Sequence, residues 1–332
     1  MAGCSGPEPS AIVGSGGAES HASGSIIASQ AGVQPASGLI LTWTDSSGNA
    51  EVDAIDPATG AAGTVATFVS PDTSISIDPE IVEMTYGSSP MGRAMFSPDF
   101  HRVVAVKKTS AAAVHVGWLD TTGTFTDVSA ATNTTSGSAT VTADDTPMFG
   151  TDGTFYFARR EAGVGPKKQP TIVKVPNGLT GPATAMKTLS PDEGVNYFVN
   201  PDGTLVGVQY GGGTFQENGA GVGGFVVQDW INSTEYVAVD FSQSGIYRVK
   251  AKPRSKSDLM DSPTDGIALF QPTDRTPSYT VVSPDGASVA FLSMAPNSGS
   301  HELYTVGSAG GGTPKKVPAS AVPNKAKLIG WK

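Results

Sequence analysis

Residues that could carry out nucleophilic or acid–base chemistry are few in this sequence of 332 residues. It contains one cysteine and four histidines: Cys4, His21, His101, His115 and His301. Nucleophilic catalysis needs a nucleophile, a general base and an orienting acid within hydrogen-bond reach. No Gly-x-Ser-x-Gly motif leads into a helix-forming segment, so we predict no catalytic residues.

Metal ligands are equally sparse, because no His-x-x-x-His, Cys-x-x-Cys or EF-hand pattern occurs. We therefore expect no metal and no cofactor. Three carboxylate pairs stand close in sequence: Asp144 with Asp145, Glu80 with Glu83, and Asp258 with Asp261. We expect them to lie in solvated loops, with a calcium or ligand contact as the alternative. A glycoside-type acid–base pair cannot be assigned, because its defining distance depends on the fold.

Two further motifs resemble binding sites. Gly219–Gly224 satisfies G-x-G-x-x-G, but a β-rich segment follows where a dinucleotide site needs a helix N-terminus. Basic residues alternate with others from Lys250 to Lys256, through Lys252 and Arg254. We interpret them as an exposed edge strand protected by charge, with an anion or polysaccharide patch as the alternative. The net charge of −9 argues against nucleic-acid binding.

The composition indicates a β-rich chain with many turns. The sequence has 41 glycines and 24 prolines, too many for a helical bundle or coiled coil. One cysteine excludes a disulfide scaffold. No run of about 18 apolar residues occurs that could span a membrane.

A repeated unit organises the chain from Leu39 onward. Its clearest copy places strands at Tyr279–Val282 and Ser288–Leu292 around the turn Ser283–Gly286, followed by a third strand at His301–Val306 and a short fourth strand. Equivalent first turns fall near residues 100, 153, 203, 233 and 286. Repeats of this length with four strands are typical of β-propeller blades.

The two ends of the chain complete the pattern. Leu39–Thr44 reads as an inner strand with no Pro-Asp-Gly turn before it, and Lys327–Lys332 reads as a first strand with nothing after it. Pairing them closes the ring and removes an open sheet edge. We therefore predict an all-β fold, a single β-propeller of six four-stranded blades over residues 38–332, with five or seven blades as alternatives.

Residues 279–317 resemble the WD40-like propeller repeats of the TolB family. They carry Ser-Pro-Asp-Gly, Val-Ala-Phe, Glu-Leu-Tyr-x-Val and Gly-Gly-x-Pro-Lys-Lys-Val, and positions 95–123, 148–178 and 197–208 carry parts of the pattern. The resemblance implies a propeller. It says little about function, because this repeat serves transport, peptidase-associated, sensor and carbohydrate-related proteins.

The N-terminal segment has a different character. Met1-Ala2-Gly3-Cys4 resembles the end of a bacterial lipobox, which would make Cys4 a lipidation site. The following residues, up to position 37, are mainly Gly, Ser, Ala and Pro, a composition typical of a disordered tether. We expect residues 1–37 to link the propeller to a membrane through lipid on Cys4.

Aromatic residues recur at equivalent strand positions, where we expect them to pack between blades, with a sugar platform as the alternative. They are Phe96, Trp118, Phe149, Tyr156, Phe198, Trp230, Phe291, Tyr304 and Trp331. Loops that differ between copies are the expected binding surface. They are residues 71–91, 107–113, 161–170, 211–224 and 295–300.

Taken together, these features predict a monomeric, non-catalytic binding module outside the cytoplasm, either periplasmic or at the cell surface. Its partner would be a protein or a cell-envelope glycan. Two alternatives stay open: a propeller lyase or hydrolase acting on a saccharide, and a structural or sensory ectodomain.

Overall fold

The computed structural model describes most of the chain after the N-terminal segment. The described residues are 38–77, 93–109, 114–132, 143–160, 171–188, 197–199, 203, 206–210, 213–216, 220–222, 226–240, 245–250, 252–253, 266–295, 298, 300–319, 322 and 326–332. Cys4 and the expected tether lie outside them, so lipidation stays a prediction.

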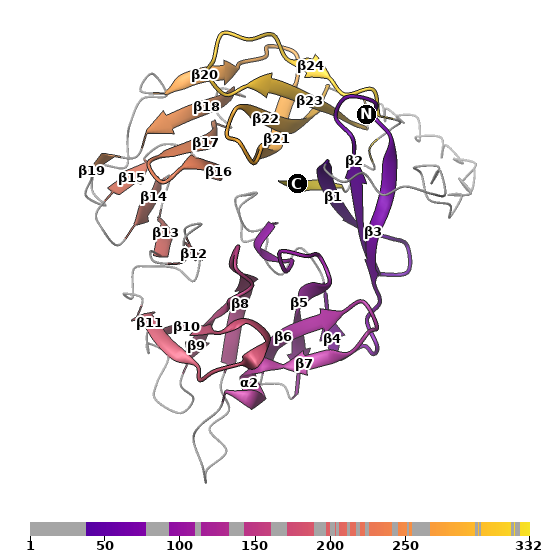
Figure 1. The fold of residues 1–332 in the computed structure, drawn as a ribbon, viewed down its shortest axis with the longest axis vertical. Coiled ribbons are helices and arrows are strands. Elements are labelled where there is room, and N and C mark those ends of the chain that lie inside the picture. The colour runs from indigo at the N-terminus through magenta and orange to yellow at the C-terminus, as the bar shows by residue number, and fades with distance from the viewer. Residues whose placement is uncertain are drawn as a thin grey trace, which may run out of the picture.

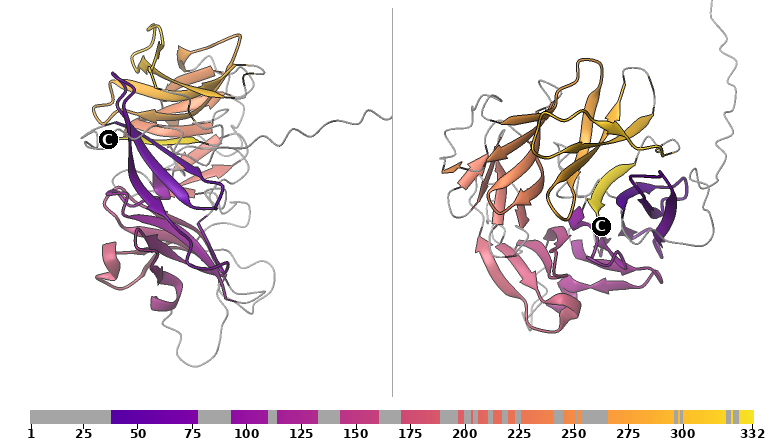
Figure 2. Two further views of the ribbon diagram at one scale, coloured as in Figure 1. Left: turned by 90° about the vertical axis from the view of Figure 1, so that its right-hand side faces the viewer. Right: turned by 45° about the horizontal axis from the view of Figure 1, so that its top comes forward.

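The described strands form a ring of antiparallel sheets (Figure 1), which Figure 2 also shows edge-on and tilted. One sheet contains β25 (Lys327–Trp331), β1 (Leu39–Thr44), β2 (Ala50–Ile55) and β3 (Ala62–Phe68). An eight-stranded sheet contains β4 (Ile75–Ser76), β5 (Arg102–Lys108), β6 (Val114–Asp120), β7 (Phe125–Asp127), β8 (Ala143–Phe149), β9 (Phe155–Arg160), β10 (Thr171–Val175) and β11 (Thr184–Thr188). A five-stranded sheet contains β12 (Tyr197–Val199), β13 (Val206–Tyr210), β14 (Gly213–Gln216), β15 (Ala220–Val222) and β19 (Lys252–Pro253).

Two four-stranded sheets complete the ring. One contains β16 (Val226–Asn232), β17 (Glu235–Asp240), β18 (Gly245–Lys250) and β20 (Ile267–Phe270), and the other β21 (Thr276–Val282), β22 (Ser288–Met294), β23 (His301–Gly307) and β24 (Lys315–Lys316). Short helices occur at α2 (Val128–Ala131) and η2 (Asn177–Leu179). In the described part of the chain, no helix is long and apolar enough to cross a bilayer.

The expected closure by the two chain ends is confirmed. β25 pairs antiparallel with β1, from Leu39 opposite Trp331 to Thr42 opposite Lys327. Gly38 and Lys332 exchange two main-chain hydrogen bonds of 2.9 Å beside this pair. Leu328 and Ile329 are fully buried, so the last strand contributes both hydrogen bonds and core to its sheet.

The described strands form five hydrogen-bonded sheets, one fewer than the expected six. The difference lies in the eight-stranded sheet, where β6 and β8 are joined by one parallel pair, Val114 with Ala143. Everywhere else in that sheet the described pairs are antiparallel. A single pair of residues therefore merges two antiparallel groups into one sheet.

The predicted first turns at 97–102 and 283–288 form as their residue types require. At Ser97–Arg102 the Asp99 carboxylate accepts hydrogen bonds from the Ser97 hydroxyl and the His101 N–H. Asp285 accepts the corresponding bonds from Ser283 and Ala287. Gly286 has φ 71°, the left-handed conformation that glycine adopts without strain.

Large aromatic residues pack between neighbouring strand groups, as expected. The Trp118 ring of β6 lies 5.9 Å from the Phe149 ring of β8 and 5.3 Å from the Phe155 ring of β9. Phe96 and Phe291 are fully buried. The Phe198 side chain lies outside the described residues.

Candidate functional site

Connections between the second and third strand of each group lie at one end of the ring, because antiparallel strands alternate in direction. We call this end the loop face; it is where β5 ends at Lys108 and β6 begins at Val114. The opposite end, with the tight first turns such as Ser97–Arg102, is the turn face. Of the loops expected to bind, those at 107–113, 161–170 and 295–300 connect strands whose ends lie at the loop face, and most of their residues lie outside the described part of the chain.

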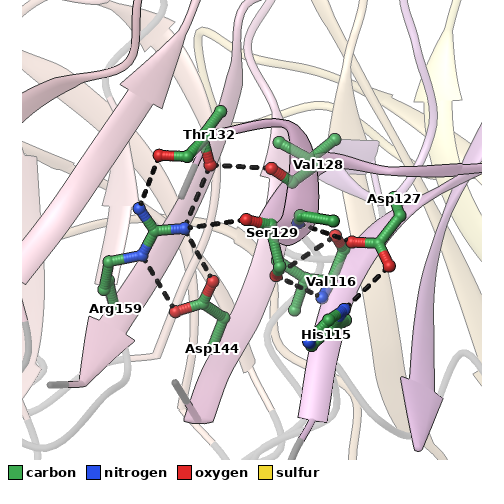
Figure 3. Close-up of polar contacts among 9 residues, drawn as sticks. His115, Val116, Asp127, Val128, Ser129, Thr132, Asp144 and Arg159 are labelled. Atoms are coloured by element: carbon green, nitrogen blue, oxygen red, sulfur yellow. Dashed lines mark hydrogen bonds and ion pairs between the residues drawn. The ribbon is translucent and has the colours of Figure 1, made fainter. Parts of the chain in front are cut away.

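His115 lies on β6 at the loop face and is paired with an acid. Its Nδ1 is 2.7 Å from Oδ2 of Asp127, and both side chains are half-buried. Asp127 also begins α2, where its Oδ1 accepts the Ala130 N–H at 2.8 Å (Figure 3). The carboxylate thus serves as helix N-cap and imidazole partner at once.

Ser129 is the second residue of α2, and its hydroxyl is a candidate nucleophile. Its hydroxyl is buried, accepts the Val116 N–H at 2.8 Å and contacts the Val116 carbonyl oxygen at 3.5 Å. Both contacts are to the main chain of β6. His115, Asp127 and Ser129 therefore lie close together in the chain but fasten α2 to β6, which is not the arrangement of a catalytic triad.

Asp144 forms the centre of a neighbouring ion pair. Its side chain is fully buried, and its two oxygens accept hydrogen bonds from Nε and Nη2 of Arg159 at 3.2 and 3.0 Å. Arg159 also donates to the carbonyl oxygen and hydroxyl of Thr132, at 3.3 and 3.0 Å. Figure 3 shows Arg159 reaching from β9 to the residues of α2.

The solvated-loop expectation is therefore wrong for Asp144, which is buried on a strand. The cation from β9 compensates the carboxylate, so burial needs no water. Asp145 lies beside it on β8. The other carboxylate pairs, Glu80 with Glu83 and Asp258 with Asp261, lie outside the described residues.

A second charged group lies at the same end of the ring. Arg275 precedes β21 and donates to Glu302 at 2.9 Å and to the Tyr304 hydroxyl at 2.6 Å. Lys316 also contacts Glu302. Hydrogen bonding, first from Lys316 and then from Tyr304 and Arg275, lowers the pKa of Glu302 to about 2.

The remaining histidines do not join these groups. His101 is exposed after the Asp99 turn, His301 begins β23 and bridges to Val322, and His21 lies outside the described residues. Within the described part of the chain, no three His, Cys, Asp or Glu side chains are grouped to hold a metal ion.

The two decoy motifs have structural roles where they are described. Ala220–Val222, inside the glycine-rich motif, forms strand β15, which agrees with the rejection of a dinucleotide site. Lys252 lies on β19, at the edge of the five-stranded sheet, as the edge-strand interpretation expects. Lys250 instead ends β18, which has a partner strand on each side. Arg254 and Lys256 lie outside the described residues.

Sequence reasoning missed Arg159 and Arg275, the cations that organise both charged groups. Arg159 is followed by Arg160 and Arg275 follows Asp274, and neither pair matches a binding motif. Only the pairing of β8 with β9 brings Asp144 opposite Arg159.

No protein-family model matches the chain, and no curated protein sequence is significantly similar. Solved structures with a similar fold include TolB from Acinetobacter baumannii, at 16% identity and a TM-score of 0.47, covering 88% of this chain and 66% of that one. A prolyl endopeptidase has 11% identity and a TM-score of 0.44, covering 86% and 44% of the two chains. Oligogalacturonate lyase from Vibrio parahaemolyticus has 12% identity and a TM-score of 0.36, covering 86% and 73%.

The chain thus spans less than two thirds of the length of the first two of these proteins. TolB proteins, which the repeat motifs resemble, are among the similar structures.

Proposed function

We propose that this protein is a non-catalytic β-propeller that binds a protein partner or a cell-envelope ligand through its loop face. The observation that carries this proposal is the difference between the two ends of the ring. At the turn face, first turns repeat one hydrogen-bond pattern, as at Ser97–Arg102 and Ser283–Ser288. At the loop face, the connections differ in length and sequence from copy to copy, which is typical of a binding surface on a fixed scaffold.

The charged groups of the loop face support binding over chemistry. Arg159 and Arg275 donate hydrogen bonds to neighbouring protein groups, and the Ser129 hydroxyl is hydrogen-bonded to the main chain. Such pairs hold a surface in shape. The Ser129 hydroxyl is held by the main chain of β6 and not by the His115 imidazole.

We further propose that lipid on Cys4 holds the protein outside the cytoplasm as a monomer, with residues 1–37 as tether. The Ala-Gly-Cys sequence and the Gly/Ser/Pro composition support this. Mass spectrometry of the protein from native membranes should find acylated Cys4. An unmodified Cys4 in that fraction would contradict the anchor, and light scattering of the detergent-free propeller would test the monomer.

We also propose that the ring is built from six repeats, the eight-stranded sheet being two of them. The single parallel pair Val114 with Ala143, and the presence of a separate first turn in each half (97–102 and 150–154), support this division. An experimental structure tests it by counting the repeats around the ring axis, and five would contradict it.

Binding is tested by photo-crosslinking in intact cells, with a crosslinker placed in turn at loop-face position Ser298 and turn-face position Thr234. We expect a discrete crosslinked product from the loop face alone. Equal products from both faces would contradict the assignment of the binding surface. Turnover of an envelope saccharide by the purified protein would contradict the non-catalytic function.

A further inference from the structure

Two half-buried side chains of opposite charge lie on the inner segments of the ring. Arg93 precedes Phe96, which bridges to Val103 of β5, and Asp229 lies on β16. In Figure 1 β16 and β25 are among the strands nearest the middle of the ring. The charges act on each other: burial raises the pKa of Asp229 to about 6, and Arg93 opposes that rise. Neither residue belongs to the charged groups of the loop face.

One side of the Arg93 guanidinium is held by its own segment. Nη1 donates to the carbonyl oxygens of Phe96 and Ser97 at 2.8 and 3.4 Å, and the guanidinium carbon lies 4.6 Å from the Phe100 ring centroid. Nε and Nη2 form no hydrogen bond to any residue that the structure describes. Neither nitrogen is among the buried polar atoms cut off from solvent.

Gly330 of β25 leaves the free edge of Arg93 uncovered. A Cβ atom at this position would lie 3.2 Å from Cδ and 3.7 Å from Nε of Arg93. The Nε–H and Nη2–H groups of a guanidinium are parallel donors, and their spacing matches the two oxygens of a carboxylate. The glycine therefore opens the edge that would bind such a group.

Asp229 does not occupy that edge. Its Oδ1 accepts the Trp230 N–H at 2.8 Å, and its Oδ2 accepts the Val282 N–H at 2.7 Å. These two hydrogen bonds hold the carboxylate on the main chains of β16 and β21. Its negative charge interacts with the positive charge of Arg93 without a hydrogen bond between them. An anion at Arg93 would find fixed donors without displacing any group of the described residues.

The inner strands favour a peptide as the carrier of that anion. Of the described strands, β16, β21 and β25 each pair on one side only, with β17, β22 and β1. Their other edges present main-chain N–H and C=O groups, apart from the Val282 N–H that Asp229 accepts, and an extended peptide can bind such groups.

We propose that Arg93 binds the C-terminal carboxylate of a peptide whose last residues lie along the inner strands. This rests on the proposed binding function and names the chemistry that one of its ligands carries. The carboxylate oxygens accept hydrogen bonds from Nε and Nη2, and Gly330 provides the space for them.

The test uses the full chain and a random hexapeptide library made in two forms, with free C-terminal carboxylates and with C-terminal amides. Peptides retained after size-exclusion chromatography are quantified by mass spectrometry. We expect retention of the carboxylate form alone and at least about a tenfold loss in Arg93→Gln, because a charge-assisted bidentate contact is removed. Arg248→Gln, which alters an ion pair with Glu235 away from the inner strands, is the matched control and should retain peptides normally.

Gly330→Ala is a second variant that tests the same site if Arg93→Gln misfolds. It keeps the charge but fills the space beside Nε, so we expect weaker retention with an unchanged circular dichroism spectrum. Equal retention of amides and carboxylates, or full retention by both variants, would overturn the proposal. Glucuronate binding that requires Arg93, without peptide binding, would overturn it in favour of an acidic sugar. If Arg93→Gln still gives the loop-face crosslink, the binding function stands whatever happens to the peptide site.

Discussion

Removing either partner of the Asp144–Arg159 pair should destabilise the fold, and the two removals should differ in size. Asp144 is fully buried, whereas the Arg159 side chain is 18% exposed. Arg159 also keeps the Thr132 carbonyl and hydroxyl as acceptors when Asp144 is gone. Asp144 has no second cation among its described contacts when Arg159 is gone. The cost of Arg159→Ala should therefore exceed that of Asp144→Ala.

The magnitudes follow from the burial of the pair. Breaking a buried ion pair costs about 3–5 kcal/mol, because it leaves one charge without its partner. We assign the lower end, about 3 kcal/mol, to Asp144→Ala and the upper end, about 5 kcal/mol, to Arg159→Ala. For a domain of this size, a loss of about 3 kcal/mol lowers Tm by roughly 5–10 °C. The double variant should lose less than the sum, because it leaves no unpaired charge.

The assay is urea denaturation at pH 7 followed by tryptophan fluorescence, with differential scanning calorimetry as a second measurement. Asp274→Ala is the matched control, since Asp274 also pairs with an arginine but its side chain is 69% exposed. An exposed pair contributes below about 1 kcal/mol. If Asp144→Ala costs no more than Asp274→Ala, or if Arg159→Ala is the milder change, the argument from burial is refuted.

Asp229→Asn should remove a pH dependence of stability. In the folded protein the pKa of Asp229 is about 6, above the ordinary 3.8, so the native state binds more protons than the unfolded state between these pH values. The free energy of unfolding of the wild type should therefore fall by about 2–3 kcal/mol as pH rises through that window. Urea midpoints from pH 4 to 7 measure this slope, and an unchanged slope in the variant contradicts it. Glu302 acts in the opposite direction. Because its pKa is lowered to about 2 in the fold, the ionised carboxylate stabilises the fold above about pH 4.5, and about 1 kcal/mol of that stability should be lost as pH falls towards 2. Glu302→Gln should not show this loss. Deleting Lys327–Lys332 should lower the free energy of unfolding by more than about 4 kcal/mol, because Leu328 and Ile329 are removed from the core. If the truncated protein melts at the same temperature as the full chain, the closure does not stabilise the fold. Gly286→Ala, at φ 71°, should cost about 1–2 kcal/mol by the same urea assay, whereas a neutral effect would mean that the turn relaxes.

Local turn chemistry made much of the fold predictable. A Ser-Pro-Asp turn specifies its own hydrogen bonds, so the turn at Asp99 and the strands beside it could be located from the sequence. The pairing of β25 with β1 was predictable for a different reason. Each end of the chain carried part of a four-stranded unit, and the two parts were complementary.

Features that depend on distant partners were not predictable. Asp144 beside Asp145 has the sequence of a solvated loop, and only Arg159, fifteen positions later on the next strand, makes its burial favourable. Arg93 stands just before the repeat segment 95–123, but its position next to Gly330 depends on ring closure by β25. The number of sheets could not be predicted either, because one residue pair between β6 and β8 decides whether two strand groups form one sheet or two.

The pairing of β25 with β1 has a consequence for the order of synthesis. A ribosome makes β1 near the beginning of the domain and β25 at its end, and chains fold from the N-terminus as they emerge. β1 must therefore keep one edge unpaired until β25 has left the ribosome. During that interval the edge is open to proteases and to other nascent chains, so the propeller is most vulnerable just before β25 emerges.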